Sequence, residues 1–326
     1  MSSVTTLDQL VVVNLDIRIW SARRKLTSSD LGGTHLPPAD LASLGSKRIC
    51  NPEELKTFGT LKARAVTLLG HNGVRFLGGW AIPEARMDAI SAELSAIQND
   101  FNKAKGTFLT RYDQVVQDWI AKHPQWAEII TNAIVGEDHV RARIGFTWQM
   151  FRVAPAEAAS SQTGSLQDDI ANLGNTLFDE VAKAAADAWK RCYAGKAEIT
   201  RKALSPLKSI YDKLKGLTFV EPRVAPVAEL LKTAFQSIPK RGSVNGSLLV
   251  MLQGLVSLLQ NPQALMEHGQ MILDGRKNSQ NILEGLFMQD VPESLREGQP
   301  GSDMEIAEPV DIPAGSVPVI ESHGLW

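Results

Sequence analysis

The segment PEARMDAISAELSAIQNDFNKAKGTFLTRYDQVVQDWIAK, residues 83–122, carries the longest regular pattern in the chain. Its apolar side chains recur every three or four residues, at Met87, Ile90, Leu94, Ile97, Phe101, Ala104, Phe108, Tyr112, Val115 and Trp119. This spacing places them on one stripe of an α-helix in a heptad-like repeat. At a rise of 1.5 Å per residue, the segment predicts a helix about 60 Å long. Pro83 suits its first turn, and His123 and Pro124 are expected to end it.

A second apolar stripe begins near Leu166 and reaches Leu217, and Pro206 is expected to kink or split its helix. Because about forty residues separate the two stripes, we expect them to pair as an antiparallel helical hairpin with a shallow crossing angle. Shorter helices are expected over residues 52–71, 125–135, 137–153, 224–237, 244–260 and 262–275. The predicted fold class is mostly α, an elongated, coiled-coil-like antiparallel hairpin or bundle of long helices with a small N-terminal β element.

The N-terminal β element rests on two segments. Between Val11 and Ile19, apolar residues alternate with more polar ones, which predicts a strand with one buried face. Residues 74–83, VRFLGGWAIP, predict two short strands bent at Gly78 and Gly79, and the second is expected to pair with the first segment. The glycines lack the G-x-G-x-x-G spacing of a dinucleotide-binding loop, so a turn is favoured over a phosphate cradle.

Composition divides the chain into three predicted regions. Residues 1–82 form a small β-containing N-terminal region, residues 83–290 a long-helix bundle, and residues 291–326 an acidic, proline-rich tail that is expected to be disordered. The tail has seven acidic residues and one arginine, a charge of −6, which leaves +4 on residues 1–290 because the total is −2. Its C-terminal Trp326 is a candidate contact for a partner.

The sequence carries no recognisable catalytic or cofactor motif. The Walker pattern and the G-x-S-x-G pattern of serine hydrolases are both missing. The six histidines are scattered, and neither Cys50 nor Cys192 has a second ligand at metal-binding spacing. We therefore expect no enzyme activity, no cofactor and no metal. With no basic leader and only two cysteines, a cytoplasmic protein is expected.

Positive charge is confined to local clusters, because the whole chain is nearly neutral. The candidate contacts for a partner or for nucleic acid are Arg23, Arg24, Lys25, Lys47, Arg48, Lys240 and Arg241.

A further basic group lies in VRARIGFTWQMFRVAP, residues 140–155. Its arginines are Arg141, Arg143 and Arg152. Arginines interleaved with aromatic residues can stack on nucleic-acid bases. At helical spacing, however, Ile144, Trp148 and Phe151 fall on one face, so a buried helix face flanked by the arginines is favoured.

The most apolar stretch is SLLVMLQGLVSLL, residues 247–259. It is shorter than the roughly 20 residues that a membrane-spanning helix needs, and Asn261 and Pro262 stop it. A buried helix is favoured over membrane insertion.

Several blocks together resemble a bacterial family of unknown function. They are VVVNLDIRIWSARRKLTSSDL, LPPADLASLGSKRICNPEEL, VRFLGGWAIP, FLTRYDQVVQDWIAKHPQWAEII and FTWQMFRVAP, and the similarity runs from about residue 8 to residue 290. Genes of that family lie in integrative and conjugative elements, beside genes for a MoxR-type AAA+ ATPase and a von Willebrand A protein similar to a cobaltochelatase subunit. The resemblance implies a third component working with these two proteins in conflict or phage-defence functions of mobile elements. It provides no catalytic residues to carry over.

The sequence supports three hypotheses about function. The leading one is a non-enzymatic scaffold or adaptor that acts with the AAA+ ATPase and the von Willebrand A protein. The alternatives are a nucleic-acid-binding protein of a mobile element and a membrane-inserting helical protein. An unpaired apolar stripe could also close on a second copy of the chain, so a homo-oligomer is a further alternative.

Overall fold

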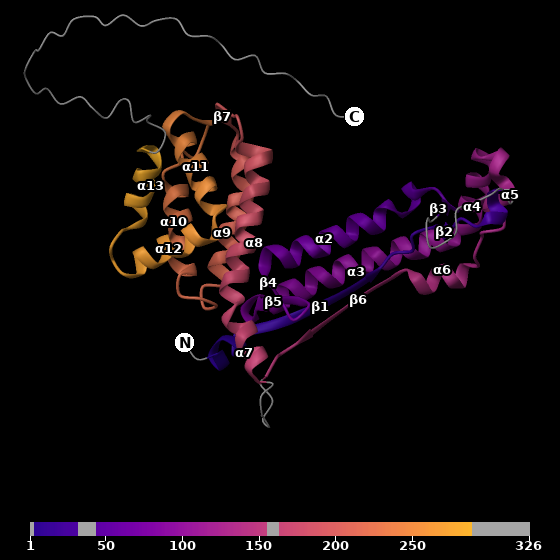
Figure 1. Cartoon of the computed structure of the whole chain (residues 1–326), viewed down its shortest axis with the longest axis horizontal. Coiled ribbons are helices and arrows are strands. Elements are labelled where there is room, and N and C mark those ends of the chain that lie inside the picture. The colour runs from indigo at the N-terminus through magenta and orange to yellow at the C-terminus, as the bar shows by residue number, and fades with distance from the viewer. Residues whose placement is uncertain (1–2, 32–43, 155–162, 289–326) are drawn as a thin grey trace, which may run out of the picture. The chain divides into compact units, whose positions relative to one another are not determined.

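Four strands from distant parts of the sequence form one antiparallel sheet in the order β4-β5-β1-β6 (Figure 1). The structure, a computed structural model, describes residues 3–31, 44–154 and 163–288. The strands are β1 (Leu10–Arg18), β4 (Val74–Phe76), β5 (Gly79–Pro83) and β6 (Gly145–Phe151). β1 pairs with β5 so that Val12 lies opposite Ala81, and the predicted pairing of these two segments is therefore confirmed.

The strand β1 is buried on both faces at its start and on one face at its end. Residues 10–13 are all buried, whereas exposed and half-buried residues alternate from Asn14 onward. Val11 and Val13 enter one hydrophobic core, called the N-terminal core below. Leu10 and Val12 enter a second, called the C-terminal core. Because side chains alternate across a strand, the sheet contributes to both cores from its opposite faces.

The helix predicted over residues 137–153 is wrong beyond Arg143. Helix α6 (Glu137–Arg143) ends there, and β6 follows, paired with β1 along its length. Trp148 and Phe151 therefore lie on opposite faces of a strand, not on one buried face of a helix. Phe151 is 41% exposed. The β element is thus not confined to the N-terminal region, because β6 comes from the middle of the chain.

The long apolar stripe of residues 83–122 is a succession of helices. A 3-10 turn, η3 (Glu84–Arg86), precedes α3 (Met87–Thr110) and α4 (Tyr112–Lys122), with an interruption at Arg111. Most of the predicted stripe is buried in the N-terminal core, namely Ile90, Leu94, Ile97, Phe101, Phe108, Tyr112 and Val115. Pro83 ends β5 opposite Leu10 and does not open a helix. The helix predicted at residues 52–71 is present as η2 (Pro52–Leu55) and α2 (Lys56–Asn72).

The second stripe is broken well before Pro206. Helices α7 (Thr163–Ala171) and α8 (Leu173–Ala188) lead into a π-helical turn, Trp189–Tyr193, and then into β7 (Glu198–Ile199), η6 (Arg201–Leu204) and α9 (Ser205–Gly216). Gly195 has a φ of 66°, a backbone conformation that side chains with a Cβ rarely adopt, so the chain turns there. Pro206 lies in the first turn of α9, where its missing N–H costs nothing.

The predicted hairpin of two long helices is not confirmed. The main packing partners of α3 are α2 and β6, whereas α8 packs against α9, α11 (Gly246–Leu259) and α12 (Pro262–Leu273). An apolar stripe predicts which residues are buried. It does not predict which element covers them.

The remaining helices form the C-terminal core with α8 and α9. Helix α10 (Val224–Gln236), α11 and α12 match their predictions, while α1 (Ser3–Asp8) and α13 (Ser279–Met288) are additional. Most apolar residues of α11 are buried as expected, at Leu249, Met251, Leu252, Leu255, Val256 and Leu259, while Leu248, Val250 and Leu258 are half-buried. In the described ranges, no single helix is long and apolar enough to span a membrane, and α11 and α12 meet that criterion only as a pair bent by 106°. The predicted acidic tail lies outside the described residues.

Candidate functional site

Two of the predicted basic clusters meet on a two-stranded antiparallel ribbon. Strand β2 (Arg23–Lys25) pairs with β3 (Ser46–Arg48). Arg23 lies opposite Arg48, Arg24 opposite Lys47, and Lys25 opposite Ser46. We call these five basic residues the basic ribbon. The pairing of β3 with β2 is what brings the two clusters together.

The register of the basic ribbon places like charges directly across from each other, which destabilises a strand pair. One of the two like-charge pairs is relieved, because Lys47 Nζ lies 2.5 Å from Asp30 Oδ1 and both side chains are largely buried. This ion pair, with hydrogen bonds from Thr27, lowers the pKa of Asp30 to about 2. Among the described residues, Arg23, Arg24, Lys25 and Arg48 have no carboxylate within 4.0 Å.

The basic ribbon is fixed to the N-terminal core at both strands. The residue before β2, Ala22, accepts a hydrogen bond from Ile49 N at 3.0 Å, and Ile49 and Cys50 are fully buried. From α4, Trp119 Nε1 donates to the carbonyl of Arg48 at 3.2 Å. Burial, with a smaller contribution from Glu54, raises the pKa of the Cys50 thiol to about 12, so the thiol is protonated near neutral pH. These contacts attach both strands of the ribbon to the N-terminal core.

A first hollow of about 370 Å³ lies beside the basic ribbon and is lined with arginine. Its charged and polar lining comes from Arg18, Arg23, Arg24, Arg143 and His139. Arg18, at the end of β1, lies over Gly145 of β6, where an added Cβ would be 3.2 Å from Arg18 Nη2. The glycine therefore makes room for the guanidinium group.

Lys105 of α3 lies close enough to Arg18 and Arg141 to be affected by their charges. The pKa of Lys105 is lowered by burial and then by the charges of Arg141 and Arg18. The Lys105 ammonium donates to the carbonyl of Ile144 at 2.6 Å. Three elements, β1, α3 and α6, thus add cationic side chains near the ribbon, which raises the local positive potential.

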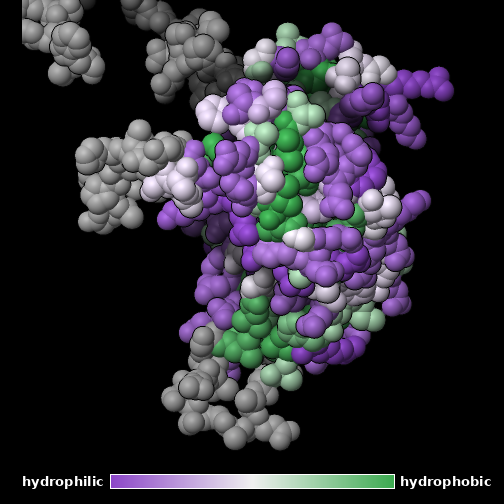
Figure 2. Space-filling view, turned by 90° about the vertical axis from the view of Figure 1, so that its right-hand side faces the viewer, coloured by the Kyte–Doolittle hydropathy of each residue, from purple (hydrophilic) through white to green (hydrophobic). Residues whose placement is uncertain are grey.

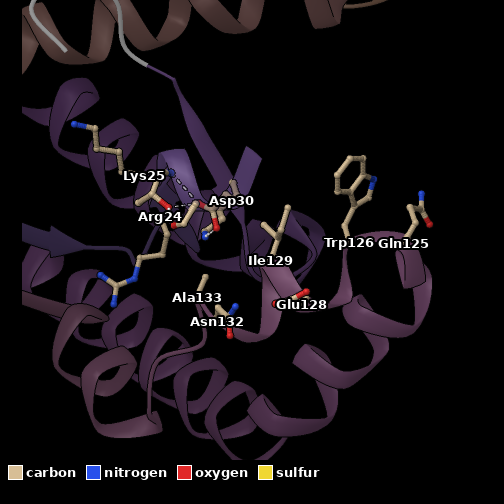
Figure 3. Close-up of a pocket in the computed structure, with 12 residues that line it drawn as sticks. Arg24, Lys25, Asp30, Gln125, Trp126, Glu128, Ile129, Asn132 and Ala133 are labelled. Atoms are coloured by element: carbon tan, nitrogen blue, oxygen red, sulfur yellow. Dashed lines mark hydrogen bonds and ion pairs between the residues drawn. The ribbon is translucent and has the colours of Figure 1, made fainter. Parts of the chain in front are cut away.

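A second hollow of about 750 Å³ lies between the basic ribbon and the segment formed by η4 (Pro124–Trp126) and α5 (Ala127–Thr131). Arg24, Lys25 and Lys47 line one side of it, and Trp126, Glu128 and Ile129 line the other. Figure 3 shows the Trp126 indole at the edge of the hollow, on the opposite side from Arg24. The side of the molecule that carries α4, α5 and α6 in Figure 1 faces the viewer in Figure 2, where mostly hydrophilic residues surround a hydrophobic band.

The other predicted contact residues are not brought to the basic ribbon. Lys240 and Arg241 are exposed and follow α10, and Lys240 lines a separate hollow with Arg201 and Tyr211. Trp326 lies outside the described residues.

The third arginine group is divided between different places. Arg141 forms an ion pair with Glu137, and Arg152 forms one with Glu84. Only Arg143 joins the ribbon surface, at the first hollow.

Sequence reasoning missed three residues of this surface. Arg18 occupies an outward position of the predicted strand, and its alternation with apolar neighbours was the available signal. His139 lies on α6 and is one of the six scattered histidines that form no motif in the sequence. Trp126 lies in the helix predicted over residues 125–135, and no sequence pattern marked it as exposed, but it is 53% exposed.

Nothing in the described residues forms a group of three or more His, Cys, Asp or Glu side chains that could hold a metal ion. A family model described as a protein of unknown function (DUF3150) matches residues 7–261. Neither the curated proteins nor the solved structures contain a match to the chain.

Proposed function

The chain belongs to the DUF3150 family of proteins of unknown function, and we propose that it is a non-enzymatic binding protein that holds the phosphate backbone of nucleic acid on the basic ribbon. The observation that carries this proposal is the strand register. It aligns Arg23 with Arg48, and these like charges repel each other, whereas Asp30 already balances Lys47 opposite Arg24. An anionic ligand at Arg23 and Arg48 would remove the remaining repulsion.

The surroundings of the basic ribbon support a polyanion in preference to a single small anion. Arg143 extends the positive surface beyond the ribbon on one side, together with Arg18, whose Nε lies 3.5 Å from the exposed carboxylate of Asp16. Lysine and arginine side chains spread over several elements fit a series of phosphates, and each contact adds to affinity by releasing a counterion. Among the described residues, the buried carboxylate of Asp30 at the ribbon is already paired with Lys47 and adds little repulsion toward phosphate.

A binding assay with a charge-reversed ribbon tests this function. The variant carries Arg23→Glu, Arg24→Glu and Lys25→Glu in the full chain, and a fluorescent oligonucleotide reports binding at low salt. Glutamates at positions 23 and 24 would face Arg48 and Lys47 as opposite-charge pairs, so the ribbon is expected to stay folded. We expect affinity to fall by about tenfold or more.

The matched control is Lys240→Glu with Arg241→Glu, which reverses an exposed basic pair away from the ribbon. Its affinity is expected to equal that of the unaltered protein. No binding by the unaltered protein at low salt, or an equal loss in both variants, would overturn the proposal.

We propose, as a second function, that the protein is an adaptor for a MoxR-type AAA+ ATPase and a von Willebrand A protein. The sequence resemblance suggests these partners, and an open edge of the sheet supports a role in binding a partner protein. Of the two edge strands, β4 is covered by α8, whereas β6 packs only against β1 and α3 among the described elements that make substantial contacts. An open edge strand can accept a strand from a partner.

Co-purification of the three proteins, with and without ATP, tests the adaptor function. Thr147→Lys places a charge on the exposed part of β6 and is expected to weaken retention, whereas Thr60→Lys on the exposed surface of α2 is not. Retention of neither partner under either condition contradicts this function. A second copy of this chain bound at the same edge would appear as a dimer in the absence of both partners.

A further inference from the structure

Trp126 is a large apolar side chain left exposed at the basic ribbon. It is 53% exposed, whereas Trp20 and Trp80 are each 6% exposed. Tryptophan offers a wide flat surface at a small cost in conformational entropy, which makes it a frequent anchor for ligands. Its exposure beside a concentration of positive charge therefore points to a ligand that has both flat rings and negative charge.

The backbone holds Trp126 in a fixed place. Pro124 opens the 3-10 turn η4, and Trp126 N donates to the carbonyl of His123 at 2.9 Å. The turn runs directly into α5, which is anchored in the interior by Ile130. The indole can change its side-chain rotamer, but its point of attachment is set by ordered structure.

The second hollow has charges of opposite sign on its two sides. Arg24 and Lys25 line the ribbon side together with the ion pair of Lys47 and Asp30, and Glu128 stands with Trp126 on the α5 side. Figure 3 shows Ile129 and Ala133 between Trp126 and the ribbon residues. A phosphate is repelled from the α5 side by Glu128, so a nucleotide would place its phosphate on the ribbon and its base toward Trp126. The volume of about 750 Å³ is sufficient for such a unit.

We infer that the second hollow binds an unpaired base stacked on Trp126, and that the protein consequently prefers single-stranded to double-stranded nucleic acid. The inference rests on the proposed nucleic-acid-binding function and specifies its substrate. In a duplex, the faces of the bases are occupied by their neighbours, and exposing one requires unstacking. A single strand presents its bases freely, and stacking on an aromatic side chain tolerates any sequence.

The test compares two fluorescent probes on the full-length protein, a 20-nucleotide oligothymidine and a 20-base-pair duplex. The unaltered protein is expected to bind the single strand more tightly. Trp126→Ala is expected to weaken single-strand binding by roughly 5- to 150-fold while changing duplex binding little. Trp126→Phe keeps an aromatic face and should recover most of the loss.

Leu273→Ala is the matched control, because Leu273 is 47% exposed but lies on α12, which packs in the C-terminal core. It should bind both probes as the unaltered protein does. If Trp126→Ala leaves the ratio of the two affinities unchanged while reversal of the ribbon charges still weakens binding, the inference fails and the proposed function stands. If neither probe binds at low salt, both fail.

Discussion

The N-terminal core and the C-terminal core differ in the side chains that fill them. The N-terminal core contains a connected group of aromatic rings, with centroid separations of 5.8 Å for Trp20 and Tyr112 and 5.0 Å for Phe58 and Phe101. The C-terminal core is filled mainly by leucine, valine and alanine from α8 to α13. Rings packed edge to face fix their neighbours in orientation as well as in position.

The basic ribbon and the pair Lys240 and Arg241 differ in how firmly the backbone holds them. The basic ribbon stands on the aromatic N-terminal core, with Ile49 and Cys50 buried directly after β3. Lys240 and Arg241 lie in an exposed bend after α10, where no strand pairing holds them. Both clusters look alike in the sequence. A charge presented by ordered backbone can bind without a large loss of entropy, whereas a charge in a bend must first be ordered.

A buried polar link joins the two cores. Lys213 of α9 is 8% exposed, and its Nζ lies 2.5 Å from Glu180 Oε2 of α8 and 2.8 Å from the carbonyl oxygen of Gly70 in α2. The other oxygen of Glu180 accepts a hydrogen bond from Arg75 N of β4 at 2.9 Å. Four elements that serve the two cores thus converge on one ion pair, and changes on either side can be compared across it.

The largest effect is expected at the sheet. A Cβ at Gly79 would lie 2.4 Å from the carbonyl oxygen of Val13, a backbone atom that cannot move without breaking the pairing of β5 with β1. Gly79→Ala is therefore expected to lower the free energy of unfolding by about 3 kcal/mol or more. Gly59→Ala, on the open surface of α2, should instead raise it by up to about 1 kcal/mol. Urea denaturation of both variants measures the contrast, and equal effects would contradict the assigned strand pairing.

The next effect is expected at the polar link. Lys213→Met leaves Glu180 without its cation in a largely buried position, which should cost about 2 to 3 kcal/mol. Adding Glu180→Leu should restore most of the loss, because an apolar pair has no charge left unpaired. Unfolding is followed by tryptophan fluorescence and by circular dichroism. If both signals of Lys213→Met report one transition at the stability of the unaltered protein, the polar link does not join the cores.

A smaller effect is expected at the ion pair between Asp30 and Lys47 of the basic ribbon. The pKa of Asp30, about 2 in the folded chain, is below its ordinary value of 3.8, so the stabilisation from its ion pair is present above pH 4 and is lost as pH falls toward 2. Asp30→Asn removes it at every pH. The difference in melting temperature between the two proteins should therefore shrink between pH 5 and about pH 2. A difference that does not change with pH would mean that the ion pair does not form.

Thiol labelling of the two cysteines compares how readily the two cores open. Cys50 is fully buried in the N-terminal core, with its pKa raised by burial, whereas Cys192 is half-buried against the C-terminal core. A thiol reagent should label Cys192 in the folded protein, and Cys50 only as fast as the N-terminal core opens. Cys192→Ser should abolish the rapid phase. Rapid labelling of that variant would show that the N-terminal core is looser than its packing indicates.

Local periodicity was sufficient to predict the buried stripe of α3 and the pairing of β1 with β5. It failed where two periods fit the same residues, because Trp148 and Phe151 suit one helix face as well as two strand faces. The hydrogen-bonding partner, β1, decides between them, and that partner is far away in the sequence.

The candidate site was predicted in part. The residues Arg23 and Arg48 were identified by charge alone, but their juxtaposition depends on the strand register, which no local pattern encodes. Lys240 was identified by its charge in the same way, but it lies in a bend and not on a paired strand. Trp126 was missed because the composition of its segment does not reveal whether a tryptophan is buried or exposed.

The most direct test of the central claim, that the basic ribbon binds phosphates, is the salt dependence of oligonucleotide binding. For a single strand, each lost phosphate contact reduces the slope of log affinity against log salt concentration by about 0.7. Replacing Arg23, Arg24 and Lys25 by glutamate should therefore reduce the slope by about 2, whereas reversing Lys240 and Arg241 should leave it unchanged. An unchanged slope in the ribbon variant would contradict the account, because it would show that these three side chains do not contact phosphate.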